Sequence, residues 1–184
     1  MCLAQNVRMD RDALAALIAS RLRDVPDFPK PGVVFKDFTP LLADPVAMRA
    51  IVDDAVARYS GEVDVIAGIE ARGFMIGTAV AVALGVPFVP IRKKGKLPAA
   101  TFTASYDLEY GTETIEVHQD SCREGQRVLV MDDVLATGGT AAAACELIER
   151  TGAQVVALDV VCEIGFLRGR ERLGGHRVRS LLSI

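Results

Sequence analysis

Hydrophobic residues along the chain alternate between helical spacing and strand-length runs. Helical spacing, with the apolar residues on one face, predicts helices at residues 12–23, 45–59, 73–84 and 139–150. Apolar runs predict strands at residues 63–69, 86–92, 126–134, 154–164 and 177–182. Because strands and helices follow one another in turn, the pattern predicts an α/β fold with a mostly parallel central sheet flanked by helices.

Three segments depart from this alternation. Residues 101–116 alternate apolar and polar positions around Gly111, which predicts an antiparallel hairpin. Residues 27–38 are punctuated by proline and glycine, and predict an ordered loop with a short extended piece. A short basic helix is expected near residues 167–172. We find no linker or internal repeat, so the pattern predicts a single domain over residues 1–184.

One uncharged stretch, residues 74–91, is long enough to suggest a membrane span. Pro87 and Pro90 interrupt it, and small residues fill its first half. A buried helix at residues 74–84, followed by a buried strand at residues 86–91, explains the stretch more simply.

The composition indicates a soluble globular protein and argues against a nucleic-acid binder. The chain is 51% hydrophobic with a formal net charge of −3, whereas nucleic-acid binders show a clustered basic face. Its only basic run contains Arg92, Lys93, Lys94 and Lys96. This run is too short to cover a duplex and suits a single polyphosphate.

The four cysteines lie far apart, without a C-x-x-C pair or a histidine in a shared motif. Metal binding through sulfur is therefore not expected. Cys145 and Cys162 fall in apolar elements, and we expect both to be buried. Free thiols and the lack of a secretory leader indicate a reducing cytoplasm.

The most informative segment is RVLVMDDVLATGGTAAAACELI, residues 127–148. A predicted strand carries Asp132 and Asp133 near its end, and a glycine-rich loop then leads into a helix. The glycines let the backbone approach a ligand closely, and the helix N-terminus attracts an anion. The two carboxylates repel phosphate but suit sugar hydroxyls or a metal.

Two familiar phosphate motifs do not fit this segment. The residue before Thr140 is Gly139 and not the lysine of a P-loop, and the glycines lack the spacing of a dinucleotide fingerprint. A site for one phosphate beside a diol, as in a ribose 5-phosphate, fits the residues best. An ordinary strand-to-helix turn remains the alternative interpretation.

The segment resembles the signature of the type I phosphoribosyltransferases, in which a strand, two acids and a T-G-G-T-type loop bind phosphoribosyl pyrophosphate. The resemblance implies the fold of that family, with a small hood and a flexible antiparallel loop. It implies that Asp132 and Asp133 contact the ribose hydroxyls. It assigns the 5-phosphate to Ala136, Thr137, Gly138, Gly139 and Thr140.

A second turn between a predicted strand and a helix has the sequence Glu70-Ala71-Arg72-Gly73. An arginine in front of a helix N-terminus suits an anion. In the family that the chain resembles, this turn binds pyrophosphate and often contains a non-proline cis peptide. The resemblance therefore implies that Ala71, Arg72 and Gly73 bind the donor's pyrophosphate.

Residues 91–111, IRKKGKLPAATFTASYDLEYG, are similar to the adenine phosphoribosyltransferase family within this group, as are residues 27–45 and 161–173. The resemblance implies that Glu109 is the general acid/base that accepts a proton as adenine N9 attacks the ribose. It implies that a loop at about residues 93–118 closes over the site, where Tyr110 would cover the reacting centre.

The same resemblance assigns further binding residues. Arg92, Lys93 and Lys96 match residues that meet the pyrophosphate, in this family partly from the neighbouring subunit, which implies a homodimer.

Other matched positions contact adenine from a hood at about residues 1–45. Val34, Phe35 and Lys36 match the segment that contacts the base, and Ile164 would form the apolar floor of the pocket. The family commonly has Arg at the position of Lys36. Since Arg presents a planar fork and Lys a point charge, the change bears on side-chain contacts and not on backbone contacts.

The implied reaction joins adenine to phosphoribosyl pyrophosphate and gives AMP and pyrophosphate, with Mg²⁺ held mainly by the substrate. A phosphoribosyltransferase for xanthine or guanine is one alternative, which acceptor kinetics would separate. A phosphoribosyl-pyrophosphate-sensing transcription regulator is another. It would need a DNA-binding module, for which the short helix before Asp27 leaves no room.

Overall fold

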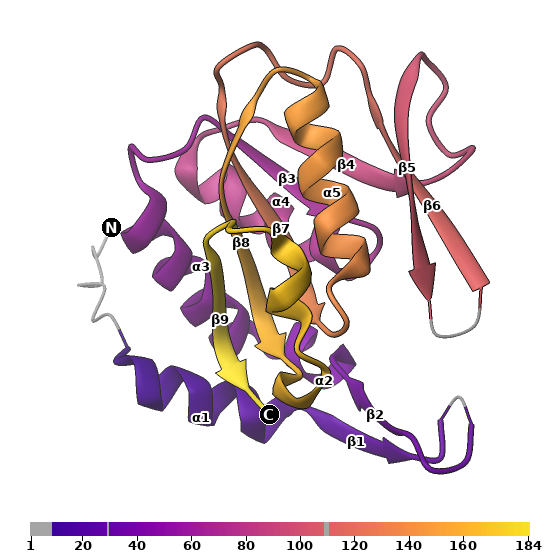
Figure 1. The fold of residues 1–184 in the computed structure, drawn as a ribbon. Coiled ribbons are helices and arrows are strands. Elements are labelled where there is room, and N and C mark those ends of the chain that lie inside the picture. The colour runs from indigo at the N-terminus through magenta and orange to yellow at the C-terminus, as the bar shows by residue number, and fades with distance from the viewer. Residues whose placement is uncertain (1–8, 29, 109–110) are drawn as a thin grey trace, which may run out of the picture.

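A seven-stranded sheet forms the centre of the protein, a computed structural model that describes residues 9–28, 30–108 and 111–184 (Figure 1). In spatial order its strands are β5 (Thr101–Leu108), β6 (Gly111–His118), β4 (Phe88–Lys93), β3 (Val65–Ile69), β7 (Arg127–Leu135), β8 (Gln154–Glu163) and β9 (Val178–Ser183). In this order, each neighbouring pair from β4 to β9 is parallel. Strand β6 pairs antiparallel with both of its neighbours, β5 and β4. The predicted mostly parallel sheet is confirmed.

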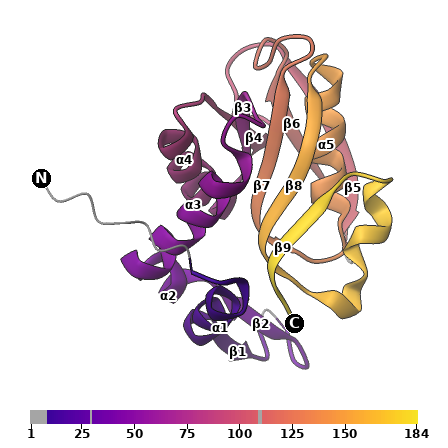
Figure 2. The ribbon, with the colours of Figure 1, turned by 90° about the vertical axis from the view of Figure 1, so that its left-hand side faces the viewer.

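Helices cover both faces of this sheet (Figure 2). They are α3 (Pro45–Tyr59) and α4 (Arg72–Leu84) on one face and α5 (Gly139–Arg150) on the other. Successive residues of a strand point to opposite faces, so Leu129 packs with Ile51 and Ile76 of the first layer, and Val130 packs with Leu147 of the second. Burial on both faces explains why the central strands are continuously apolar.

The N-terminal part differs from the sequence prediction. Helix α1 (Arg11–Arg21) ends before Arg23, so the predicted extension of that helix is wrong. The chain instead forms β1 (Arg23–Pro26), which pairs antiparallel with β2 (Val34–Asp37). The ion pairs Arg23–Asp37 and Lys36–Asp24 join the two strands across the ladder. A short helix, α2 (Thr39–Leu42), then leads into α3.

The predicted basic helix near residues 167–172 is also wrong in type. The chain forms two 3₁₀ helices, η1 (Gly165–Leu167) and η2 (Gly169–Leu173). Arg168 separates them with a left-handed backbone (φ 55°), which no α-helix tolerates.

The uncharged stretch at residues 74–91 divides as expected into α4 and β4, although β4 begins at Phe88, two residues later than predicted. Gly85 ends α4 in the left-handed conformation (φ 71°). Across the described part of the chain, no helix combines the length and apolarity needed to cross a membrane. Cys145 and Cys162 are buried free thiols, as expected.

Candidate active site

A pocket of about 270 Å³ lies where β3 and β7 end and α4 and α5 begin. Its lining comes from these two strand-to-helix turns, the end of β4 and the hairpin of β5 and β6. The carboxyl ends of parallel strands are where open α/β sheets bind ligands. The two predicted anion turns therefore face one shared pocket.

Asp132 and Asp133 lie near the end of β7 and line this pocket. Asp133 is only 3% exposed, and Arg72 Nε lies 2.7 Å from its Oδ2. Burial raises the pKa of Asp132 well above its usual value, and the adjacent Asp133 carboxylate raises it further. Burial also raises the pKa of Asp133, although the Arg72 guanidinium opposes that rise. A hydroxyl donor or a cation reaching these carboxylates would replace the hydration lost through burial.

The predicted phosphate loop joins β7 to α5. Ala136, Thr137, Gly138 and Thr140 line the pocket. Gly138 caps the helix in a left-handed conformation (φ 83°), which orients the first N–H groups of α5 at the loop. Gly139 does not line the pocket but faces a groove behind it. A Cβ at Gly139 would lie 3.2 Å from Cδ2 of Tyr106.

The predicted pyrophosphate turn follows β3. Ala71 and Arg72 line the pocket, and the peptide bond between Glu70 and Ala71 is cis, as the family resemblance led us to expect. Gly73 does not line the pocket and instead brings α4 against β7. A Cβ at Gly73 would lie 2.7 Å from the carbonyl oxygen of Met131, so no larger residue fits this contact without a shift.

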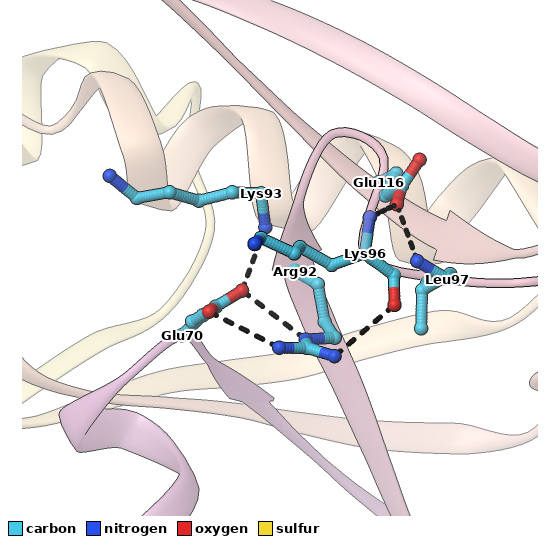
Figure 3. A network of polar contacts seen from close by, with 6 residues as sticks. All are labelled: Glu70, Arg92, Lys93, Lys96, Leu97 and Glu116. Atoms are coloured by element: carbon cyan, nitrogen blue, oxygen red, sulfur yellow. Dashed lines mark hydrogen bonds and ion pairs between the residues drawn. The ribbon is translucent and has the colours of Figure 1, made fainter.

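The basic residues at the end of β4 and just after it form a network with two buried or half-buried carboxylates (Figure 3). Glu70 accepts hydrogen bonds from Nε and Nη2 of Arg92 and from the Lys93 backbone N–H. Glu116, which is 4% exposed, accepts hydrogen bonds from the backbone N–H groups of Lys96 and Leu97. Of the three predicted cations, only Lys93 lines the pocket, whereas Arg92 bonds to Glu70 and to the Lys96 carbonyl.

Hydrogen bonding lowers the pKa of both carboxylates in this network. The Lys93 N–H and the Arg92 guanidinium hold the pKa of Glu70 below its usual value despite partial burial. Backbone N–H groups of the loop at residues 95–97 do the same for Glu116. Both groups are therefore ionised at neutral pH and hold the basic loop in a fixed position.

Of the polar residues that line the pocket, three were not assigned roles from the sequence: Glu70, Tyr106 and Glu113. Tyr106 and Glu113 face each other across the β5–β6 ladder, and the Tyr106 hydroxyl donates to Glu113 at 3.1 Å. The other oxygen of Glu113 pairs with Lys93. The alternating pattern on both sides of Gly111 predicted this pair of strands, and their register pairs Leu108 with Gly111.

The four predicted adenine residues lie outside the pocket. Val34 is 56% exposed, and Lys36 pairs with Asp24 on β1. The Phe35 ring lies beside the Arg72 guanidinium, with 5.8 Å between the Arg72 Cζ and the ring centroid. Ile164 is half-buried and donates its N–H to the Leu135 carbonyl. Arg72 therefore lies between the Phe35 ring of β2 and the pocket.

Glu109 and Tyr110, predicted for catalysis and loop closure, lie outside the described residues. The strands that lead to them end at Leu108 and start again at Gly111, on the hairpin that supplies Tyr106 and Glu113 to the pocket. Among the residues that the structure describes, no three His, Cys, Asp or Glu side chains are grouped to hold a metal by themselves.

The sequence and the fold match proteins of known family. A family model described as the phosphoribosyl transferase domain matches residues 44–175. A relative from Acidothermus cellulolyticus named adenine phosphoribosyltransferase is 57% identical over 172 residues, which cover 93% of this chain and 97% of the relative.

Solved structures with the same fold carry the same name. The adenine phosphoribosyltransferase of Thermoanaerobacter pseudethanolicus matches with a TM-score of 0.88 and 45% identity, over 92% of this chain and 99% of that chain. The enzyme from Trypanosoma brucei, in complex with AMP, pyrophosphate and ribose-5-phosphate, matches with a TM-score of 0.87 and 29% identity, over 100% of this chain and 87% of that chain.

Proposed function

The chain belongs to the adenine phosphoribosyltransferase family, and we propose on that basis that it transfers the 5-phosphoribosyl group of phosphoribosyl pyrophosphate to adenine. The products are AMP and pyrophosphate, and the reaction serves purine salvage. The observation that carries the proposal is the shared pocket, in which two strand-to-helix anion turns flank a pair of aspartates. This arrangement suits a ribose that carries a phosphate at C5 and a pyrophosphate at C1.

The donor is assigned to the pocket by charge and hydrogen bonding. Asp132 and Asp133 accept from the ribose hydroxyls, which are donors that do not repel a carboxylate. Residues 136–140 bind the 5-phosphate through backbone N–H groups at the start of α5 and through two threonine hydroxyls. Arg72, with Ala71, binds the pyrophosphate, and its guanidinium forms charge-assisted hydrogen bonds to the phosphate oxygens. Gly73 does not line the pocket, so its proposed role is to let this turn pack closely against β7.

Lys93 lines the same pocket, which supports a second positive charge at the pyrophosphate. Its ammonium group pairs with Glu113, which raises the pKa of Lys93, so the side chain is charged throughout the neutral range. Arg92 and Lys96 lie beside this pocket but do not line it. This placement supports a homodimer in which they contact the pyrophosphate of the partner subunit.

Magnesium fits the carboxylates at the end of β7. The carboxylates of Asp132 and Asp133 line the pocket, with Arg72 Nε 2.7 Å from Oδ2 of Asp133, and carboxylate oxygen is the ligand type that Mg²⁺ prefers. We propose that Asp132 and Asp133 hold the ion together with oxygens of the substrate. Bound Mg²⁺ would neutralise the charge that develops on the leaving pyrophosphate.

Glu109 is proposed to accept the adenine N9 proton as the base attacks ribose C1, because a positioned carboxylate is a suitable base for that step. Tyr110 is proposed to cover the reacting centre and exclude water. Adenine itself is assigned to Val34, Phe35, Lys36 and Ile164 of the hood and floor. Since the Lys36 ammonium pairs with Asp24, its contribution to adenine binding is assigned to the backbone.

We assign the protein to the cytoplasm. The argument rests on its cysteines, of which Cys122, Cys145 and Cys162 are free and buried, as expected in a reducing compartment.

The first experiment measures pyrophosphate release from phosphoribosyl pyrophosphate and Mg²⁺ with adenine, guanine, hypoxanthine or xanthine. We expect turnover with adenine alone, and a fall in kcat of about 10²- to 10⁴-fold in Glu109→Ala. The exposed Glu124→Ala serves as the matched control and should retain the wild-type rate.

The other outcomes separate the parts of the proposal. Turnover with an oxopurine would overturn the acceptor assignment and leave the donor site in place. Donor binding without turnover on any base would favour a phosphoribosyl-pyrophosphate sensor.

A further inference from the structure

The segment Gly165–Leu173, outside the pocket, packs directly against the phosphate loop. A Cβ added at Gly169 would lie 2.2 Å from the Ala136 carbonyl oxygen and 3.1 Å from the Gly138 nitrogen. A Cβ added at Gly138 would in turn lie 2.2 Å from the Gly169 carbonyl oxygen. Two backbones therefore touch here at a distance that only a pair of glycines permits.

The residue after Gly169 ties this contact to the sheet. Arg170 forms a two-pronged ion pair with Glu163 at the end of β8, with both N···O distances at 2.7 Å. Its guanidinium also donates to the Val178 carbonyl and to Ser180 Oγ on β9. Glu163 is 8% exposed, and the Arg170 guanidinium is the main cause that holds its pKa below the usual value.

The far end of η2 is fixed to α5, the helix that the phosphate loop starts. Leu173 is 1% exposed and packs in the core beneath this helix, and Nε2 of His176 lies 2.8 Å from Glu149 on α5. The segment therefore spans from the sheet edge to α5 and crosses beneath the loop between them. No residue of the segment lines the pocket.

We propose that Gly169 and the Glu163–Arg170 ion pair are positioning residues that hold the 5-phosphate loop in its anion-binding conformation. The proposal rests on the proposed function, in that residues 136–140 take the donor's 5-phosphate. The loop consists of small residues and has little side-chain packing of its own, so its conformation depends on the backbone against which it lies. A displacement of about 1 Å in such a loop is enough to weaken binding and catalysis severely.

The test is Gly169→Ala, with steady-state kinetics for both substrates. The added methyl group must displace the Ala136 carbonyl, so we expect the KM for phosphoribosyl pyrophosphate to rise about tenfold or more while the KM for adenine stays close to the wild-type value. Gly165→Ala is the matched control. Its added Cβ would meet nothing closer than 3.4 Å, and it should leave both KM values unchanged.

A second pair of variants keeps the test independent of a folding defect in Gly169→Ala. Arg170→Met removes the ion pair and should raise the KM for the donor selectively, and Arg170→Lys should restore part of the loss. Thermal unfolding with and without phosphoribosyl pyrophosphate supplies a second measurement, in which the donor stabilises wild type more than either defective variant.

The outcomes distinguish this proposal from the function on which it rests. Wild type that neither binds nor turns over the donor would overturn the proposed function. Active wild type, with donor KM values unchanged in folded Gly169→Ala and Arg170→Met, would overturn the positioning role. Equal rises in both KM values would do the same, because they would indicate a general structural effect.

Discussion

Gly73 is the residue at which α4 meets β7, and a single added methyl group tests that contact. A Cβ there would lie 2.7 Å from the Met131 carbonyl oxygen and 3.1 Å from Asp132 Oδ1. We expect Gly73→Ala to lower the free energy of unfolding by about 1–3 kcal/mol through overpacking, more than alanine adds through helix propensity. Chemical denaturation measures this change.

The same variant should also impair the donor site, because the displaced groups belong to the carboxylate end of β7. We expect a higher KM for phosphoribosyl pyrophosphate in Gly73→Ala. Thr78→Ala, exposed on the same helix, should change neither stability nor kinetics appreciably. A fully stable, fully active Gly73→Ala would show that the helix and strand separate easily.

Pocket residues that a local sequence motif marks could be predicted. Pocket residues whose position depends on partners far away in the chain could not. Asp132, Asp133 and Arg72 follow from strand-to-helix turns that a short sequence window reveals, and all three line the pocket. Glu70 and Glu113 were missed because their partners, Arg92 and Lys93, lie about twenty residues away in the chain.

Helix α3 illustrates how a capping residue fixes an element. Asp44 accepts from the backbone N–H groups of Val46 and Ala47, and its carboxylate pairs with Arg21 of α1. We expect Asp44→Ala to lower the midpoint of thermal unfolding by a few degrees. Asp44→Asn keeps the capping hydrogen bonds and loses only the ion pair, so we expect a smaller fall in the unfolding midpoint. An equal fall in the unfolding midpoint of the two variants would mean that the ion pair, and not the cap, stabilises the helix.

At the scale of elements, prediction succeeded where the sequence carries end signals. The bounds of α3 and α5 match the prediction, since Pro45 and Gly139 mark their first residues. Strand β1 was missed because it is stabilised by pairing with β2, which no local pattern reveals. The two 3₁₀ helices were missed because the backbone at Arg168 is set by packing and not by propensity.

The stability of the whole molecule should depend on pH through Asp159 on β8. This residue is 4% exposed, and burial raises its pKa from 3.8 to about 6, against the opposing effects of Tyr59, Arg58 and Arg177 and with help from Asp54. Between these two pH values the unfolded chain releases its proton and the folded chain keeps it. Stability therefore falls as pH rises through this window, by about 3 kcal/mol from this residue.

The comparison of wild type with Asp159→Asn isolates this contribution from other buried acids. We expect the free energy of unfolding of the variant, relative to wild type, to increase by about 3 kcal/mol from about pH 4 to above about pH 6. Urea unfolding across the pH series measures the difference. A difference that is constant with pH would mean that Asp159 titrates at its ordinary pKa when folded.

The contact between Gly138 and Gly169 also has a consequence for the order in which the nascent chain folds. During synthesis, the phosphate loop at residues 136–140 leaves the ribosome before the segment at residues 165–173, which packs against it, and before β9. A nascent chain can thus complete the centre of its sheet while its anion site is still unsupported. Competence to capture the donor would then arise only once residues 165–173 have been synthesised and have packed against the loop.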